Sequence, residues 1–319
     1  MFVVPERLIA GLMTPEDAFG AVEAVFAAMA RGEARNFPVV REALGEGRQY
    51  GFKSGLDRVG SALGVKAGGY FPGNAAKGII NHQSTVFLFD PDTGILQAAV
   101  AGNLLTALRT AAASAISIDW LARRDARVLG MIGAGHQAAF QLRAAARARD
   151  FDRVIAWNYH PDMLSRLETV AGDLGLPFEA VPLDRMREAD VIVTITSAPA
   201  FSLAAKHVSP GTHLACMGTD TAGKQEIEPA LLARARVFTD EVEQSVTLGE
   251  AQHAVAAGLI RAGDITPIGS VITGKAPGRR SDDEITLFDG TGVGLQDIAV
   301  AAKVLDLARA QGLAIEVEL

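Results

Sequence analysis

Val128-Leu-Gly-Met-Ile-Gly-Ala-Gly-His-Gln137 is the stretch that decides the fold of this chain. An apolar run ends in Gly133-Ala134-Gly135 and leads into alanine-rich sequence that reaches about Ala148. The pattern predicts a buried parallel strand, a tight glycine turn and a helix whose N-terminus can hold an anion. Gly133 would allow the turn, and Gly135 would let the backbone approach a pyrophosphate. Because this segment lies near residue 130, we expect the preceding part of the chain to carry the substrate chemistry.

Composition and charge narrow the class of protein. The 319 residues are 49% apolar and 21% charged, which is typical of a globular α/β protein with one or two domains. A net charge of −7 argues against nucleic acid or an anionic membrane as the main partner. The one cysteine, Cys216, fits a reducing cytoplasm, and the histidines lack metal-ligand spacing, so we expect no metal site. Residues 1–7 resemble no signal peptide, and we expect no membrane span.

The pattern of apolar residues changes along the chain and predicts two kinds of domain. Thr14-Pro15-Glu16-Asp17 begins a helix over 14–31. Short apolar runs at 37–40, 50–53, 62–66 and 85–89 then predict an antiparallel or mixed sheet, followed by a helix over 104–122.

From residue 127 onward, strands alternate with helices, as in a doubly wound parallel sheet of the Rossmann type. We expect a dinucleotide-binding Rossmann domain over 122–300, and an α+β domain over 1–121 with 301–319 that carries the substrate chemistry. The expected strands are 127–132, 153–157, 190–195, 213–217, 236–239 and a last one at 314–317, and the expected helices are 137–148, 161–174, 228–234 and 295–311.

Four cationic residues of the first domain follow or interrupt apolar runs. They are Arg41, Lys53, Lys66 and Arg109. A buried cation is costly unless an anion pairs with it, and a carboxylate substrate would be a natural partner. Each residue could instead pair with a neighbouring acid or extend to the surface. For any one of these cations, such a structural role and a role in binding an anionic ligand are equally favoured. For all four together, the structural role is disfavoured.

Asp220 follows a predicted parallel strand by a Gly-Thr step. A carboxylate at the carboxyl edge of such a sheet can exchange a proton with an amine or imine nitrogen. An aspartate after Gly-Thr is more commonly a helix cap or a turn residue, and spacing alone does not decide between the two. We interpret His82 as a structural histidine, and His136 as the start of a helix and not as a base.

Seven motifs occur in order over nearly the whole chain: Leu63–Lys66, Phe71–Asn74, His82–Val86, Leu105–Thr110, Gly133–Gln137, Gly218–Glu226 and Ser281–Gly292. Together they resemble the ornithine cyclodeaminase/μ-crystallin family. The family includes cyclodeaminases, alanine dehydrogenases and ketimine reductases, which transfer hydride between nicotinamide and the α-carbon of an amino or imino acid. Its members are similar in being dimers that associate through the N-terminal domain. The resemblance therefore implies that 1–121 with 301–319 is a substrate-binding and dimerisation domain and that 122–300 is an NAD-binding domain.

The resemblance implies a role for each matching residue. Arg41 and Arg109 would clamp the substrate α-carboxylate, Lys66 would polarise the carboxylate or nitrogen, and Asp220 would donate the proton. The catalytic pair would therefore be Lys66 and Asp220. The residues expected to contact the cofactor are Thr85, Arg109, Gly133, Ala134, Gly135, His136, Gln137, Asn158, Thr196, Met217, Gly292 and Val293.

Two departures from the family pattern refine the expected function. Lys53, in Phe52-Lys-Ser-Gly55, is an extra cation that indicates a second substrate carboxylate, hence a dicarboxylic imino acid such as iminosuccinate, which would give L-aspartate. Asn158 stands where an acidic residue or an arginine would bind the ribose, and this favours NAD over NADP. The alternatives are an ornithine cyclodeaminase, which recycles NAD without net redox change, and an alanine dehydrogenase or ketimine reductase of the same family. A non-enzymatic alternative is a μ-crystallin-like protein that binds the cofactor.

Overall fold

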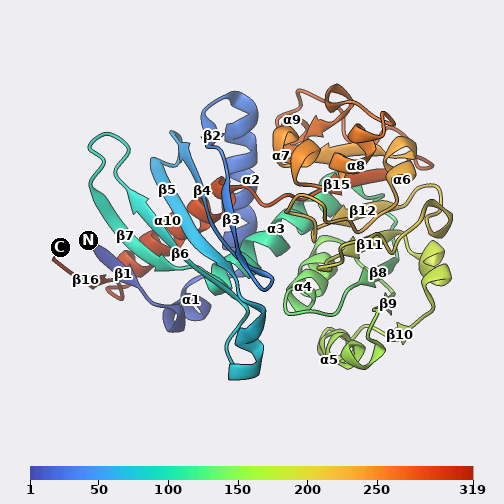
Figure 1. Cartoon of the computed structure of the whole chain (residues 1–319), viewed down its shortest axis with the longest axis horizontal. Helices are drawn as coiled ribbons and strands as arrows, with labels where there is room; N and C mark the ends of the chain where they lie inside the picture. The colour runs from blue at the N-terminus through green and yellow to red at the C-terminus, as the bar shows by residue number, and fades with distance from the viewer. Residues whose placement is uncertain (319) are drawn as a thin grey trace. The chain divides into compact units, whose positions relative to one another are not determined.

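The computed structural model describes residues 1–318, which form two compact units (Figure 1). The first unit is Met1–Arg109 with Val293–Leu319, of which Leu319 lies outside the described residues. The second unit is Thr110–Gly292. In residues 1–318, no helix combines the length and the apolar character that crossing a membrane requires.

The first unit is built on a mixed sheet, as expected. The strand order is β16-β1-β7-β6-β5-β4-β2, and β3 pairs with β4. The pairing of β1 with β7 is parallel and the others are antiparallel, so the C-terminal strand returns to the first unit as the sequence suggested. The strands are β1 (Phe2–Val4), β2 (Ala34–Asn36), β3 (Val40–Gly45), β4 (Arg48–Asp57), β5 (Ala62–Tyr70), β6 (His82–Phe89), β7 (Leu96–Ala101) and β16 (Ile315–Glu316).

Helix α10 (Gly294–Ala310) packs on one face of this sheet, and α2 (Pro15–Arg31) packs on α10 (Figure 1). Glycines on β4 and β5 allow the close approach, because an added Cβ at Gly55 would lie 2.9 Å from Leu295 Cδ2. We call the face that α10 covers the inner face. The expected domain boundary at 300/301 would cut through α10, and the structure places the division at 292/293. The first unit also contains α1 (Glu6–Leu12) and the 3-10 turn η1 (Pro72–Lys77). The boundary between Arg109 and Thr110 falls within α3 (Asn103–Leu121).

The second unit contains a doubly wound parallel sheet, so the predicted fold class is confirmed. The strand order is β10-β9-β8-β11-β12-β15-β13-β14, and every pairing is parallel. The order reverses between β8 and β11, where ligands bind in such folds. The strands are β8 (Val128–Ile132), β9 (Arg153–Trp157), β10 (Phe178–Ala180), β11 (Val191–Thr194), β12 (His213–Cys216), β13 (Arg236–Thr239), β14 (Thr266–Pro267) and β15 (Thr286–Asp289).

The connections in this unit are mostly short helices, and the core beneath them is apolar. The α-helices are α4 (Ala138–Ala148), α5 (Ser165–Asp173), α6 (Pro229–Arg234), α7 (Val242–Thr247), α8 (Ala251–Ala256) and α9 (Ile268–Ile272). The 3-10 turns are η2 (Pro161–Leu164), η3 (Leu183–Glu188), η4 (Ala205–His207) and η5 (Ala262–Asp264).

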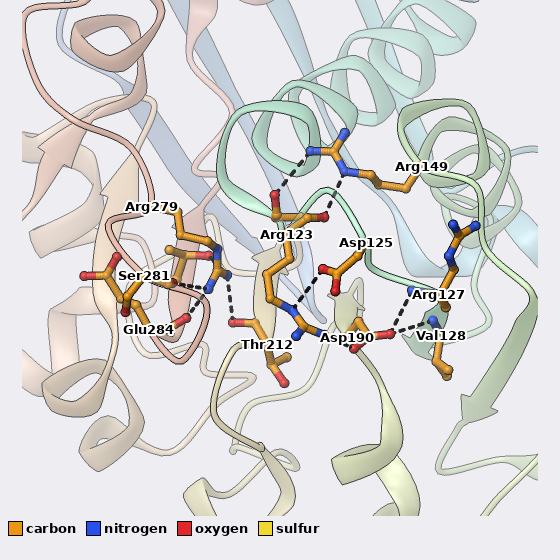
Figure 2. A network of polar contacts seen from close by, with 12 residues as sticks. Arg123, Asp125, Arg127, Val128, Arg149, Asp190, Thr212, Arg279, Ser281 and Glu284 are labelled. Carbon is orange, nitrogen blue, oxygen red and sulfur yellow. Dashed lines mark hydrogen bonds and ion pairs between the residues drawn. The ribbon is translucent and has the colours of Figure 1, made fainter.

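A polar network holds the amino-terminal edge of this sheet (Figure 2). The Asp190 carboxylate accepts hydrogen bonds from the Arg123 guanidinium at 2.5 Å and from the Val128 backbone N–H at 2.9 Å. Arg279 donates to the Leu121 carbonyl at 2.8 Å and to the Thr286 hydroxyl at 2.8 Å. These bonds satisfy backbone groups at the start of β8 and at the end of α3. A cavity of about 570 Å³ beside the network lies at the edge opposite the glycine turn, and we assign no chemistry to it.

Candidate active site

The inner face of the first sheet gathers the predicted cations. Lys53 on β4 stands directly opposite Lys66 on β5, and their residues are only 8% and 6% exposed. Arg41 on β3 pairs with Gly51, two residues before Lys53, and so belongs to the same face. Because side chains alternate along a strand, these three cations come from three neighbouring strands to one surface.

A buried carboxylate lies among these cations. Asp297, in the first turn of α10, accepts a hydrogen bond from Arg109 Nε at 3.0 Å and is 2.6 Å from Lys66 Nζ. Gln296 Oε1 accepts from Arg109 Nη1 at 3.1 Å. The sequence reasoning missed Asp297 and Gln296. The available signal was a polar pair at the start of an otherwise apolar helix, where a buried acid requires a cationic partner.

The charges of this cluster interact strongly. Burial lowers the pKa of the Lys66 ammonium to about 8, although Asp297 acts in the opposite direction. Burial alone would raise the pKa of Asp297, but the Arg109 and Lys66 cations bring it down to about 2. Burial, and then the same two cations, lower the pKa of His82 to about 4. At neutral pH the cluster therefore combines a neutral imidazole, one carboxylate and several cations, an environment that favours an anionic ligand.

Thr85 differs from the other residues predicted in this unit. It pairs with Ala67 on β5, whereas Val86 pairs with Lys66. Thr85 therefore belongs to the face of the sheet opposite Lys66, because neighbouring residues of a strand point to opposite sides. This placement does not favour the predicted contact with nicotinamide, which stays a prediction.

The glycine turn after β8 has the geometry that a dinucleotide needs. Gly133 has a φ of 105°, and an added Cβ would lie 2.5 Å from the Ile195 carbonyl oxygen on the neighbouring strand. An added Cβ at Gly135 would meet nothing within 4 Å, so its surroundings are open. Helix α4 begins after Gln137, whose side chain does not cap it. The buried Gln137 Oε1 has no hydrogen-bond partner among residues 1–318. A tight glycine turn that opens into a helix beside open space fits a pyrophosphate.

Other predicted cofactor residues lie at the carboxyl ends of the strands of the second unit. Asn158 follows β9, and its amide nitrogen donates to the His160 carbonyl at 2.8 Å. Thr196 follows β11, and Met217 follows β12 with its backbone N–H bonded to the Thr194 carbonyl at 2.8 Å. Ala134 is buried within the glycine turn, whereas His136 is exposed. The shared edge is the expected ligand edge of a doubly wound sheet.

Asp220 occupies the loop after β12, as predicted. Its Oδ1 atom lies 3.1 Å from Lys224 Nζ and accepts a hydrogen bond from the Thr221 hydroxyl at 3.2 Å. Lys224 also donates to the Gly218 carbonyl at 2.8 Å. The side chain of Asp220 is 39% exposed, so it can meet a ligand from solvent. Sequence reasoning did not single out Lys224, although its spacing of four residues from Asp220 was visible.

Gly292 is held by a buried acid. The Gly292 backbone N–H donates to Asp240 Oδ2 at 2.8 Å, and the Thr291 hydroxyl donates to Asp240 Oδ1 at 2.6 Å. Val293 is the N-cap residue of α10. A search of residues 1–318 for groups of three or more potential metal ligands finds none.

Residues 6–312 match the ornithine cyclodeaminase/mu-crystallin family. The chain belongs to this family. It is 64% identical to the iminosuccinate reductase of Paracoccus denitrificans (strain Pd 1222), with full coverage of both chains. The crystal structure of the Paracoccus denitrificans iminosuccinate reductase in complex with NAD+ superposes with a TM-score of 0.96 over 100% of this chain and 99% of that one. An archaeal alanine dehydrogenase dimer with bound NAD is 32% identical, with a TM-score of 0.94 over 100% of this chain and 99% of that one.

Proposed function

We propose that this protein is an NADH-dependent reductase that converts iminosuccinate to L-aspartate. The observation that carries the proposal is the pairing of Lys53 with Lys66 beside the Arg109–Asp297 ion pair. The α-carboxylate is assigned to Arg41 and Arg109, because the guanidinium group is suited to bidentate binding of a carboxylate. The additional lysine on the same face then serves a second carboxylate. The 64% identity to an iminosuccinate reductase supports the same substrate class.

The second unit fits a dinucleotide. The uncapped start of α4 and the open surroundings of Gly135 would hold the pyrophosphate, and Gln137 Oε1 is an acceptor without a partner in residues 1–318. Asn158 after β9 would bind the ribose, and since no cation directly follows it, NAD is favoured over NADP. The relatives with bound NAD+ and NAD support this choice.

The residues of the chain have distinct tasks in the proposed reaction. When bound, NADH supplies the hydride that the α-carbon of the imine receives. Arg41 and Arg109 hold the α-carboxylate, and Lys53 holds the distal one. Lys66, as a cation, stabilises negative charge next to the reacting carbon. The carboxyl group of Asp220 gives its proton to the nitrogen, so that a carbon–nitrogen double bond becomes an amine.

We also propose that the protein is a cytoplasmic homodimer joined through the outer face of the first sheet. Tyr50 and Phe52 on β4 and Val40 on β3 are exposed there, and Val40 is paired with Phe52. Exposed apolar side chains grouped on a sheet favour a protein–protein interface. The archaeal alanine dehydrogenase dimer supports the dimeric state. The buried free thiol of Cys216 is compatible with a reducing compartment, and cell fractionation would test the location.

One spectrophotometric comparison tests the reaction. NADH oxidation is followed with oxaloacetate plus ammonia, with pyruvate plus ammonia, and with a cyclic imino acid. The proposal expects the highest kcat/KM with oxaloacetate plus ammonia, and higher kcat/KM with NADH than with NADPH. A preference for pyruvate or for the cyclic imine would contradict it. Ornithine converted to proline without net NADH consumption would instead identify a cyclodeaminase.

Two variants separate the roles of the cations. Lys53→Met should lower kcat/KM for the dicarboxylic imine by roughly 10–100-fold, the effect of losing a charge-assisted hydrogen bond, and spare the monocarboxylic imine. Arg109→Lys should impair both substrates, because both carry the α-carboxylate. Equal losses for the two substrates in Lys53→Met would remove the basis for a dicarboxylate.

Asp220→Asn tests the proton donor. It should leave NADH binding intact and lower kcat by about 10²–10⁴-fold, the usual contribution of general acid–base catalysis. Fluorescence titration measures the first quantity, and steady-state kinetics the second. Turnover within a few-fold of wild type would remove Asp220 from the mechanism.

A further inference from the structure

The loop of residues 218–226, which carries Asp220, is closed by two of its own side chains. Glu226 Oε2 accepts a hydrogen bond from the Gly218 backbone N–H at 2.8 Å. Lys224 Nζ donates to the Gly218 carbonyl at 2.8 Å and lies 3.1 Å from Asp220 Oδ1. Two side chains near the C-terminal end of the loop therefore bind the backbone of Gly218 at its N-terminal end, two residues before Asp220.

Glu226 also ties this loop to the neighbouring strand. Its Oε2 accepts from the Thr194 hydroxyl at 2.7 Å, and its Oε1 accepts from the Thr196 backbone N–H at 2.6 Å. The β11–β12 ladder ends at Thr194 and Cys216, so these bonds extend the connection past the last paired residues. Glu226 is 2% exposed, and water does not compete with bonds at such a site.

A second carboxyl group holds Glu226 in place. Glu250, the N-cap residue of α8, accepts from the Glu226 backbone N–H at 2.8 Å and is hydrogen-bonded to the Thr219 hydroxyl. Burial, with the charges of Glu226 and Asp289, raises the pKa of Glu250 well above its usual value. Burial raises the pKa of Glu226 as well, and the hydrogen bonds that its carboxyl group accepts from the Thr194 hydroxyl and from the Thr196 and Gly218 N–H groups oppose that rise.

The packing around Gly218 is tight. An added Cβ there would lie 2.5 Å from Glu226 Oε1 and 2.4 Å from the Thr196 carbonyl oxygen. The three segments that meet at this point, the end of β11, the start of the loop and Glu226, therefore have little freedom to separate. Asp220, by contrast, is partly exposed and lies in a segment without a regular ladder of its own.

We propose that Glu226 is a positioning residue for Asp220. By binding Gly218, Thr194 and Thr196 together, it fixes the loop of residues 218–226 at the carboxyl edge of the sheet. Proton transfer requires the donor within hydrogen-bond reach of the acceptor, and an untethered loop spends most of its time elsewhere. The inference rests on the proposed role of Asp220 as proton donor.

The test is a double-mutant cycle of Glu226→Gln with Asp220→Asn in the full-length protein. An amide nitrogen cannot accept a hydrogen bond, so Glu226→Gln loses at least one of the three. We expect kcat at saturating NADH to fall roughly 10–100-fold, the effect of losing a charge-assisted hydrogen bond. In the Asp220→Asn background the same change should have less than about a threefold further effect, since coupled residues are not additive.

Glu228→Gln is the matched control. Glu228 also accepts a backbone N–H, but from Ala205, at 2.7 Å, which lies outside the loop of residues 218–226. Its kcat should stay near that of wild type. Thr194→Val is the milder variant, because it removes one hydroxyl donor and keeps the shape of the side chain. It should lower kcat roughly 2–10-fold, the effect of a neutral hydrogen bond, and it replaces Glu226→Gln if that variant does not fold.

Hydrogen exchange adds a readout that does not depend on the substrate. Peptides covering residues 216–222 should exchange faster in Glu226→Gln than in wild type or in Glu228→Gln. Losses that multiply in the double mutant, or an unchanged kcat in the folded single variant, overturn the inference. If Asp220→Asn alone has the kcat of wild type, the proposed role of Asp220 as proton donor is wrong. If instead Asp220→Asn lowers kcat and the losses of the two single variants multiply in the double variant, only the positioning role of Glu226 is wrong.

Discussion

Lys66 is subject to two opposing influences, burial and the adjacent carboxylate of Asp297. Burial lowers the pKa of its ammonium to about 8, and Asp297, 2.6 Å away, raises it. If the cation is required, kcat/KM should decline as the pH rises through about 8, by about tenfold for each further pH unit. Measuring kcat/KM between pH 6 and 10 tests this, and a profile without an alkaline limb would contradict a cationic Lys66.

Removing the negative charge of Asp297 should move that alkaline limb. In Asp297→Asn the favourable partner of Lys66 is lost, while its burial and the Arg109 cation remain. The pKa of Lys66 should therefore fall further, and the decline in kcat/KM should begin at a lower pH than in wild type. A limb that stays in place, or moves to higher pH, would show that Asp297 does not stabilise the Lys66 cation.

At the scale of elements, the two glycines of the turn after β8 differ in a testable way. Gly133→Ala should destabilise the protein without cofactor by more than about 1–2 kcal/mol, because its φ of 105° is unfavourable for an L-residue and its Cβ would meet the Ile195 carbonyl. Gly135→Ala should leave that stability unchanged, since its Cβ would enter open space.

For Gly135→Ala, the affinity for NADH should change although the stability of the protein without cofactor does not. If the pyrophosphate approaches this backbone, Gly135→Ala should weaken NADH binding although the protein without cofactor is as stable as wild type. Urea denaturation and fluorescence titration give the two quantities. Normal NADH affinity in Gly135→Ala would place the pyrophosphate elsewhere.

The sequence predicted most of the longer elements, and the shortest ones escaped it. The helix over 14–31 was correct because Thr14 and Asp17 form a capping box that local sequence specifies. Strand β15, of four residues, was missed, although it lies in the middle of the sheet between β12 and β13. Only Leu287 and Phe288 of this strand are apolar, which is too few for a period to be recognised, and its place in the sheet depends on partners distant in sequence.

At the scale of the whole molecule, stability and activity of the second unit should be separable. Asp190→Ala removes an acceptor from Arg123 and from two backbone N–H groups at the amino edge of the sheet. It should lower the free energy of unfolding by about 1.5–3 kcal/mol, the range for hydrogen bonds to charged groups, and leave kcat near wild type. Asp125→Ala, whose side chain is 77% exposed, should change the stability little. Urea denaturation measures the free energy of unfolding of both variants, and steady-state kinetics measures kcat. A large loss of kcat in folded Asp190→Ala would contradict the separation of stability from activity.

The proposed dimer makes a further prediction at this scale. Phe52, 42% exposed on the outer face, becomes buried in the proposed interface, so Phe52→Glu should shift the protein toward monomer in sedimentation velocity. Ile95→Glu is the control, because Ile95 is 66% exposed between β6 and β7 and away from the apolar group of Val40 and Phe52. If both variants remain dimeric at low concentration, the interface lies elsewhere.

The sequence by itself determined the fold class, the glycine turn and the cations of the first unit, because these depend on periodicity and residue type within short stretches. Only the tertiary structure revealed that Asp297 lies between Lys66 and Arg109, the latter 188 residues away in the chain. It alone placed Thr85 on the other face of the sheet and Glu226 between two strand ends. Such partners are chosen by how helices and strands pack and by strand register, which no local pattern contains.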